Sequence, residues 1–150
     1  MQVKQFFNSS NIVYKAHDTA LHKCRYRPDF LFEKSDLYVV VEVDERQHSN
    51  TYYNRKGEDS RMLAIAKELA KPTVFIRFNP DDYSSDFQTQ FNDRLQYLLH
   101  WLRMCYNYTP KNKCEKIYLF YDGWNPNNVI PITVVDTELD LDFNKIKLVD

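Results

Sequence analysis

The sequence predicts an α/β protein in which helices pack against a central mixed β-sheet, in a three-layer type of sandwich. Two short apolar runs, 37–44 and 73–78, have the composition of buried strands. A helical pattern at 58–70 lies between them, which is the order of a strand–helix–strand unit. The strongest helical pattern, at 85–106, follows the second run, and two more strand-like segments come after it.

The N-terminal quarter predicts a hairpin. Residues 4–17 indicate a short helix followed by an extended piece, and 25–32 have a composition rich in strand-forming residues. The tetrapeptide "EKSD" at 33–36 is typical of a turn. Segments 25–32 and 37–44 therefore form two antiparallel strands in this prediction.

The middle of the chain predicts a loop, a helix and a strand. Residues 45–57 are polar and read as a loop, and the helix of 58–70 ends before Pro72. The strand of 73–78 ends before Pro80. The helix presents one apolar stripe, formed by Met62, Ile65, Ala66 and Leu69.

The helix of 85–106 is amphipathic, and Asp86 is its candidate N-cap. Its apolar face consists of Phe87, Phe91, Leu95, Leu98, Leu99 and Leu102. Segments 116–124 and 129–135 predict two late strands, separated by a turn at 125–128. Residues 136–142 alternate acids with other residues and indicate an exposed strand.

The length of 150 residues favours a single domain, 1–150. Its core is expected at about 10–106, with a C-terminal strand addition at about 115–150 and a boundary at 107–114. The three cysteines are odd in number and widely spaced, which favours reduced thiols and gives no zinc-binding pattern. The chain has no long apolar run and no signal peptide, so we expect a soluble, intracellular protein without membrane contact.

Composition excludes several classes of function. The chain has only two glycines and neither a G-x-G-x-x-G nor a P-loop motif, so a nucleotide cofactor is not expected. Its 20 basic and 21 acidic residues give a net charge of −1. Binding to nucleic acid would therefore depend on a local basic patch rather than on the charge of the whole protein.

Carboxylates interrupt the apolar strand "VVVEVD". Strand alternation places Val40, Glu42 and Asp44 on one face, with neighbours roughly 6.5–7 Å apart. The preceding strand contributes Asp29, which can pair beside Glu42. Three converging acids offer the oxygen ligands that Mg²⁺ or Mn²⁺ prefers, and His48 could activate a water.

A salt-bridge network accounts for the same acids equally well. Nearby arginines can neutralise them without a metal, and His48 taken alone is more often a surface residue than a catalyst. The candidate partners are Arg25, Arg27, Arg46 and Arg61.

A longer sequence pattern favours the metal site over the salt-bridge network. The chain reads R-P-D-F, then V-V-V-E-V-D-x-x-Q-H, a polar loop, E-D-x-R, and V-F-I-R-F-N-P-D, with "YLFYDG" at 118–123 as a weaker match. Over about 25–83 this order resembles the PD-(D/E)XK nuclease superfamily. It is most similar to the branch around the very-short-patch DNA repair endonucleases, including relatives in large DNA viruses. The resemblance implies a restriction-endonuclease-like fold.

The resemblance implies Asp29 and Glu42 as metal-binding acids, with the peptide carbonyl of Val43 as a further ligand. Where the common pattern has a lysine two residues after the second acid, this chain has Asp44. The short-patch branch also lacks that lysine and uses a histidine six residues on, the position of His48. Asp29, Glu42, Asp44 and His48 are thus the implied catalytic residues.

One family feature is missing. An acid is expected on an N-terminal helix, and Asp18 is the only acid before Asp29. The implied activity is that of a Mg²⁺- or Mn²⁺-dependent endodeoxyribonuclease, with DNA as partner; a homodimer is compatible with it. The expected DNA-binding patch comprises Lys23, Arg25, Arg27, Arg46, Arg55, Lys56 and Arg61.

Two other functions compete with the nuclease. One is a catalytically inactive nuclease fold that binds DNA or a protein; its expected sign, loss of the acids, is not seen here. The other is a metal-independent interaction protein with aromatic anchors. Its candidate anchors are Tyr52, Tyr53, Tyr106, Tyr108, Tyr118, Tyr121 and Trp124.

Overall fold

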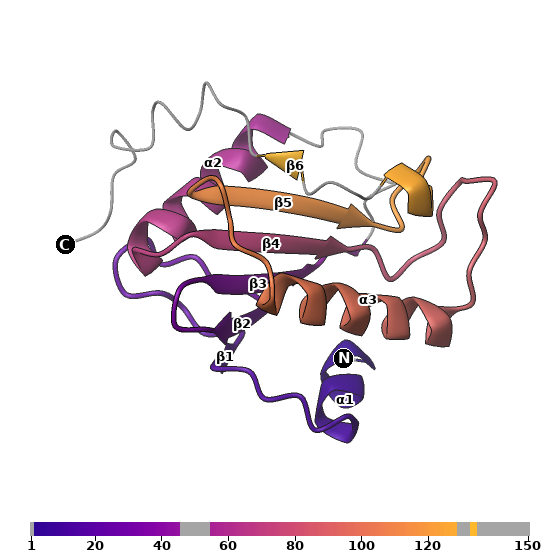
Figure 1. Ribbon diagram of the computed structural model, residues 1–150, viewed down its shortest axis with the longest axis horizontal. Coiled ribbons are helices and arrows are strands. Elements are labelled where there is room, and N and C mark those ends of the chain that lie inside the picture. Colours follow the sequence, from indigo (N-terminus) through magenta and orange to yellow (C-terminus); the bar gives the residue numbers. More distant parts are fainter. Residues whose placement is uncertain (1, 46–54, 129–132, 135–150) are drawn as a thin grey trace.

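In the computed structural model, which describes residues 2–45, 55–128 and 133–134, six strands form one mixed sheet (Figure 1). They lie in chain order across the sheet. The bounds are β1 Ala16–His17, β2 Phe30–Glu33, β3 Tyr38–Val43, β4 Thr73–Phe78, β5 Cys114–Leu119 and β6 Thr133–Val134. Strands β3, β4 and β5 are parallel, whereas β1, β2 and β6 each run antiparallel to their neighbours. The α/β class and mixed sheet predicted from the sequence are confirmed.

Helices cover both faces of the sheet. Helices α1 (Gln2–Ser9) and α3 (Phe91–Tyr106) pack on one face, and α2 (Arg55–Leu69) packs on the other. Strand alternation separates the two layers: Val39 and Val41 contribute to the cluster under α1 and α3, and Val40 contributes to the cluster under α2. The parallel connection from β3 to β4 runs through α2 (Figure 1).

Helix α1 belongs to the hydrophobic core. Phe7 is fully buried, and its ring makes edge contacts with Phe30 at 5.0 Å and with Phe32 at 5.6 Å between centroids. Val3, one turn earlier, is 1% exposed. The core therefore extends further toward the N-terminus than residue 10, where the sequence placed its beginning.

The strand at 73–78 is found, and β2 and β3 form the predicted antiparallel hairpin. The first strand of the hairpin was predicted at 25–32, but β2 begins only at Phe30. Helix α2 begins at Arg55, three residues before the predicted start. Strand β5 ends at Leu119, whereas the sequence predicted a strand up to residue 124. The strand stops there because Phe120 has a positive φ of 64°. The predicted turn at 125–128 contains a 3₁₀ helix at Pro126–Asn128.

At the C-terminal end, β6 lies inside the predicted strand of 129–135. The exposed strand predicted at 136–142 lies outside the described residues. In the part of the chain that the structure describes, Cys24, Cys105 and Cys114 form no disulfide bond, and no helix is long and apolar enough to cross a membrane.

The prediction of a helix from residue 85 was wrong at its start. Helix α3 begins at Phe91, with Gln90 and not Asp86 at the N-cap position. The preceding segment is held by other contacts: Ser85 Oγ donates to the carbonyl of Trp124, and Tyr83 donates to the carbonyl of Phe87. One bond to a distant loop and one local bond thus take the place of the first turn of the predicted helix.

Within the described ranges, three residues other than Gly, Asn or Asp adopt a left-handed backbone. They are Arg25 (φ 60°), Ala70 (φ 62°) and Phe120 (φ 64°). Ala70 directly follows α2, where its N–H donates to the carbonyl of Ala66 at 3.1 Å. A left-handed conformation costs such residues roughly 1–2 kcal/mol, and at the end of a helix the position favours glycine.

Replacing Phe7 with alanine is expected to lower the free energy of unfolding by about 3–5 kcal/mol, because a fully buried ring is lost from between two others. Urea denaturation measures the change. Gln5→Ala, on the exposed side of the same helix, is the control and should change stability by less than about 0.5 kcal/mol. Equal stabilities of the two variants would show that α1 does not dock on the sheet in solution.

Candidate functional site

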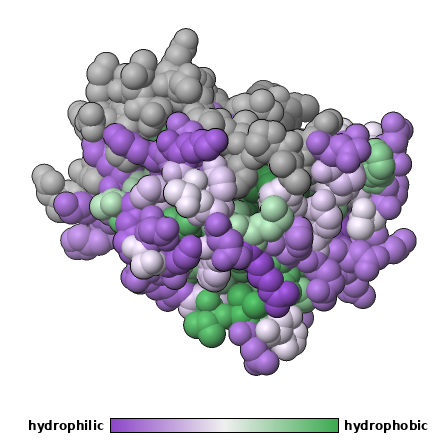
Figure 2. Space-filling model, viewed as in Figure 1, coloured by the Kyte–Doolittle hydropathy of each residue, from purple (hydrophilic) through white to green (hydrophobic). Residues whose placement is uncertain are grey.

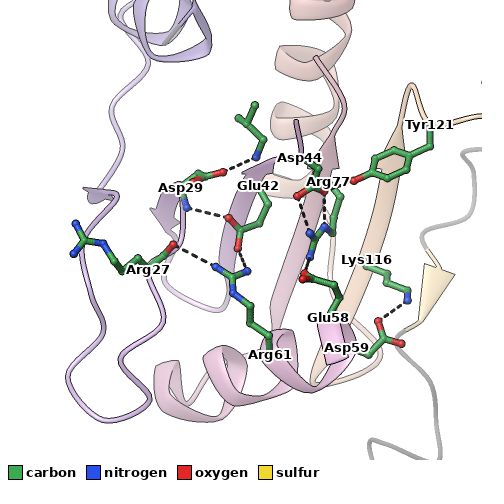
Figure 3. A network of polar contacts seen from close by, with 11 residues as sticks. Arg27, Asp29, Glu42, Asp44, Glu58, Asp59, Arg61, Arg77, Lys116 and Tyr121 are labelled. Carbon is green, nitrogen blue, oxygen red and sulfur yellow. Dashed lines mark hydrogen bonds and ion pairs between the residues drawn. The ribbon is translucent and has the colours of Figure 1, made fainter. Parts of the chain in front are cut away.

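The sequence-predicted acids lie at one edge of the sheet, on the face that α2 covers (Figure 3). Glu42 is near the carboxyl end of β3, and Asp44 follows that strand. Asp29 directly precedes β2, which runs antiparallel to β3 and therefore begins at the same edge. The register that pairs Phe30 with Val41 sets Asp29 opposite Glu42.

Asp29 and Glu42 form a pair that is linked through the backbone. The amide of Asp29 donates to Glu42 Oε2 at 3.0 Å, and the amide of Val43 donates to Asp29 Oδ2 at 2.7 Å. Arg61, from α2, donates to Glu42 Oε1 at 2.5 Å. Glu42 is 3% exposed, whereas the side chain of Arg61 is 23% exposed. The structure thus brings together two of the three acids that the sequence singled out.

Asp44 belongs to a neighbouring cluster. Arg77 on β4 donates to both carboxylate oxygens of Asp44, at 2.7 Å each. The Tyr121 hydroxyl also donates to Asp44 Oδ2, and Arg77 Nη1 forms an ion pair with Glu58 on α2 at 2.9 Å. Arg77 is 4% exposed. These bonds leave Asp44 with less capacity for a further ligand than Asp29 and Glu42 have.

Arg77 and Tyr121 were not among the predicted site residues. A signal for Arg77 exists in the sequence, because it is the one charged residue inside the apolar run "VFIRF". The parallel register pairs it with Glu42, so both side chains emerge on the α2 face. Tyr121 appeared only among the candidate aromatic anchors, with no indication that it contacts Asp44.

A third ion pair completes a row across the sheet: Lys116 on β5 donates to Asp59 on α2 at 2.7 Å, and both side chains are buried. Among the side chains that the structure describes, this network contains five carboxylates and three cations. The acids are Asp29, Glu42, Asp44, Glu58 and Asp59, and the cations are Arg61, Arg77 and Lys116 (Figure 3). With every acid ionised, two negative charges are in excess.

This excess and the burial raise the proton affinity of the acid pair. Burial raises the pKa of Glu42 to about 7, although the Arg61 guanidinium opposes the shift and Asp29 adds to it. Burial also raises the pKa of Asp29, against the hydrogen bond from Val43 and with a contribution from Asp44. Ionising both acids of the pair therefore costs free energy, and a nearby cation would reduce this cost.

The fit to a divalent cation rests on Asp29 and Glu42. Their carboxylate oxygens are the hard donors that Mg²⁺ and Mn²⁺ accept, and the local excess of negative charge is of the right sign and size. Arg61 currently neutralises Glu42, so a bound ion would have to share or replace that contact. Among the described residues, no three His, Cys, Asp or Glu side chains are grouped as a ready metal site.

Other predicted residues lie apart from this pair or outside the described residues. Arg46 and His48 lie outside them, as do the side chains of Arg55 and Lys56 at the start of α2. Arg27 is exposed and pairs with Asp18 at 3.0 Å, so Asp18 does not supply the acid that was missing from α1. The Arg27 carbonyl instead accepts a bond from Arg61 at 3.3 Å.

The proposed aromatic anchors do not form a common exposed surface in the described part of the chain. Trp124 is 8% exposed and stacks against Phe120, and Tyr106 packs on the core. Tyr118 and Tyr121 contact each other edge to face at 4.8 Å. Tyr52 and Tyr53 lie outside the described residues.

Comparisons with known proteins found no relative that could help to interpret the site. The chain matches no family model, no curated protein and no solved structure.

Replacing Glu42 with glutamine is expected to change how stability depends on pH. The folded pKa of about 7 exceeds the ordinary value of 4.5, so Glu42 stabilises the fold below about pH 4.5 and this contribution is lost as pH rises through 7. At pH 8, without metal, Glu42→Gln should be more stable than wild type by roughly 1–3 kcal/mol, and the difference should vanish near pH 4.5. Urea melts at each pH measure it, with Asp36→Asn, at an exposed acid, as the control. Parallel pH profiles for wild type and Glu42→Gln would contradict the raised pKa.

Replacing Arg77 with methionine is expected to lower the free energy of unfolding by about 3–5 kcal/mol, because Asp44 and Glu58 would keep their charges without their cation. Thermal and urea melts measure the loss. Arg103→Met, at an exposed arginine of α3, is the matched control. The double variant Arg77→Met, Asp44→Asn should recover part of the loss; an additive further loss would mean that the two residues are not coupled.

Proposed function

We propose that the protein is a metal-dependent nuclease of the restriction-endonuclease-like class, which hydrolyses phosphodiester bonds in DNA. The mixed sheet between helices and the hairpin followed by a strand–helix–strand unit are compatible with that class. The observation that carries the proposal is the buried Asp29–Glu42 pair at the edge of the sheet.

The pair supports the proposal because a cation would stabilise two ionised carboxylates held this close together. Burial raises the pKa of both groups, with a further contribution from Asp29 for Glu42 and from Asp44 for Asp29. The described side chains of the surrounding network carry two negative charges in excess. Perturbed carboxylates at the edge of a sheet are more frequent at functional sites than elsewhere. Structural ion pairs can produce the same shifts, which gives rise to the second candidate below.

In the proposed site, Asp29 and Glu42 would hold Mg²⁺ or Mn²⁺, and the carbonyl of Val43 would be the further ligand. A divalent cation there supplies positive charge for the phosphate oxygens and lowers the pKa of a nearby water. Asp44 acts differently from the expectation, as an acid that fixes Arg77 and the end of β3. His48 keeps its predicted role as the proton-transferring group.

Arg61 has two roles in this proposal. Without a cation it neutralises Glu42, and its 23% exposed side chain can turn from that acid toward a bound phosphate. A guanidinium suits the second role, since it can bond two phosphate oxygens at once.

The second candidate is an inactive nuclease fold that binds DNA or a protein. The contacts of Arg61 with Glu42 and of Arg77 with Asp44 favour it, because they satisfy these acids without any metal. In this alternative the acids serve stability alone, and the surface near them serves binding.

Mn²⁺ is expected to raise the melting temperature of the wild-type protein and to support cleavage of plasmid or oligonucleotide DNA. Asp29→Asn should abolish both effects, because it removes one ligand charge while keeping the shape of the side chain. Differential scanning fluorimetry with and without Mn²⁺, and gel assays with Mg²⁺ or Mn²⁺, measure them. Asp36→Asn is the control for the loss of one surface charge.

Two results would decide between the candidates. Cleavage by purified Asp29→Asn at the wild-type rate would overturn the assignment of the metal site. Absence of both Mn²⁺ stabilisation and cleavage in the folded wild type, together with retained DNA binding, would favour the inactive module.

A further inference from the structure

The loop between β1 and β2, residues 18–29, lies beside the acid pair and ends at Asp29. Figure 3 shows Arg27 of this β1–β2 loop next to Arg61. The loop exposes an aromatic ring together with basic side chains. Its exposed residues include His22, Lys23, Arg25, Tyr26 and Arg27. The Tyr26 side chain is 40% exposed.

Backbone bonds fix the shape of the β1–β2 loop. Glu68 on α2 accepts the amides of Lys23 and Cys24, at 2.5 and 3.1 Å. Within the loop, the amide of Leu21 donates to the carbonyl of Tyr26 at 2.9 Å, and the amide of Arg25 donates to the carbonyl of Leu21 at 3.1 Å. Tyr26 is therefore presented on an ordered turn, so binding a ligand there costs little conformational entropy.

Arg61 connects Tyr26 to the acids. Its guanidinium lies 5.4 Å from the centre of the Tyr26 ring and bonds both Glu42 and the carbonyl of Arg27. Tyr26 thus contacts Arg61, and Arg61 in turn contacts Glu42 of the proposed metal-binding pair. A base held on this ring would bring its own phosphodiester near Asp29 and Glu42.

We propose that the β1–β2 loop binds an unpaired strand of nucleic acid, with a base stacked on Tyr26 and phosphates near Lys23 and Arg25. This inference rests on the proposed nuclease function and narrows its substrate to single-stranded, flapped or frayed DNA. Arg27 contributes less, because Asp18 already neutralises its side chain.

An unpaired strand fits better than a duplex for two reasons. An aromatic ring binds the face of a base, and base faces are accessible only where the strand is not stacked in a helix. The net charge of the protein is −1, and the described loop itself offers few phosphate contacts, through Lys23 and Arg25. Stacking gives affinity that does not depend on many phosphate contacts.

Fluorescence anisotropy with a labelled oligothymidylate and a hairpin duplex, both in EDTA, tests the inference on the intact chain. Wild type should bind the single strand more tightly than the duplex. Tyr26→Ala should weaken single-strand binding roughly 5- to 100-fold, the equivalent of one base–aromatic stack, with little effect on the duplex. Tyr26→Phe should bind like wild type, because the ring is kept.

Phe87→Ala is the matched control, since Phe87 is 42% exposed on a different loop. Replacing Lys23 and Arg25 together should lower the dependence of single-strand binding on salt. Thermal melts of each variant establish that it is folded.

Equal binding of the single strand by wild type and folded Tyr26→Ala, or preference of the wild type for duplex, would overturn the inference. Neither outcome requires cleavage, so the two proposals fail separately. If Tyr26→Ala binds the single strand like wild type and DNA is still cut in a metal-dependent way, the nuclease proposal stands and the proposal for the loop is overturned. If Tyr26→Ala binds the single strand more weakly but the wild type cuts DNA under no condition, the proposal for the loop stands and the nuclease proposal is overturned.

Discussion

The guanidinium of Arg77 joins the parts of the protein that meet at the candidate site. It projects from β4, bonds Asp44 at the end of β3, and pairs with Glu58 on α2, while Tyr121 from beyond β5 reaches the same Asp44. A buried cation with this many anionic neighbours is stable only if they stay in place. The arrangement therefore ties the start of α2 and the ends of three strands into one unit.

Helix α2 is held by two different forces along its length. Its later turns rest on the sheet through apolar side chains such as Met62 and Ile65, which are fully buried. Its first turns rest on ion pairs, through Glu58, Asp59 and Arg61. Apolar packing tolerates little change in shape, whereas an ion pair can exchange one partner for another ion. The part of the helix nearest the candidate site is thus the part that can respond to a ligand.

Local patterns were sufficient for the strands and for one half of the site. Alternation identified the buried faces, and the turn after β2 fixed the hairpin, so Asp29 and Glu42 could be expected side by side. The start of α3 could not be predicted, because Ser85 is held by the distant carbonyl of Trp124 and not by a neighbouring turn. Arg77 escaped notice for a similar reason: the parallel register that sets it beside Glu42 depends on how the crossover through α2 packs.

The left-handed residue that ends α2 gives a way to recognise relatives of this chain. Ala70 occupies a left-handed position that glycine or asparagine would fill at a lower cost in free energy. The chain has only two glycines, and neither is used there. A homologue that retains the crossover between β3 and β4 has no reason to retain this alanine. An alignment of such sequences should therefore show glycine or asparagine directly before the residues that lead into β4, and this would mark the crossover even where the acids have diverged.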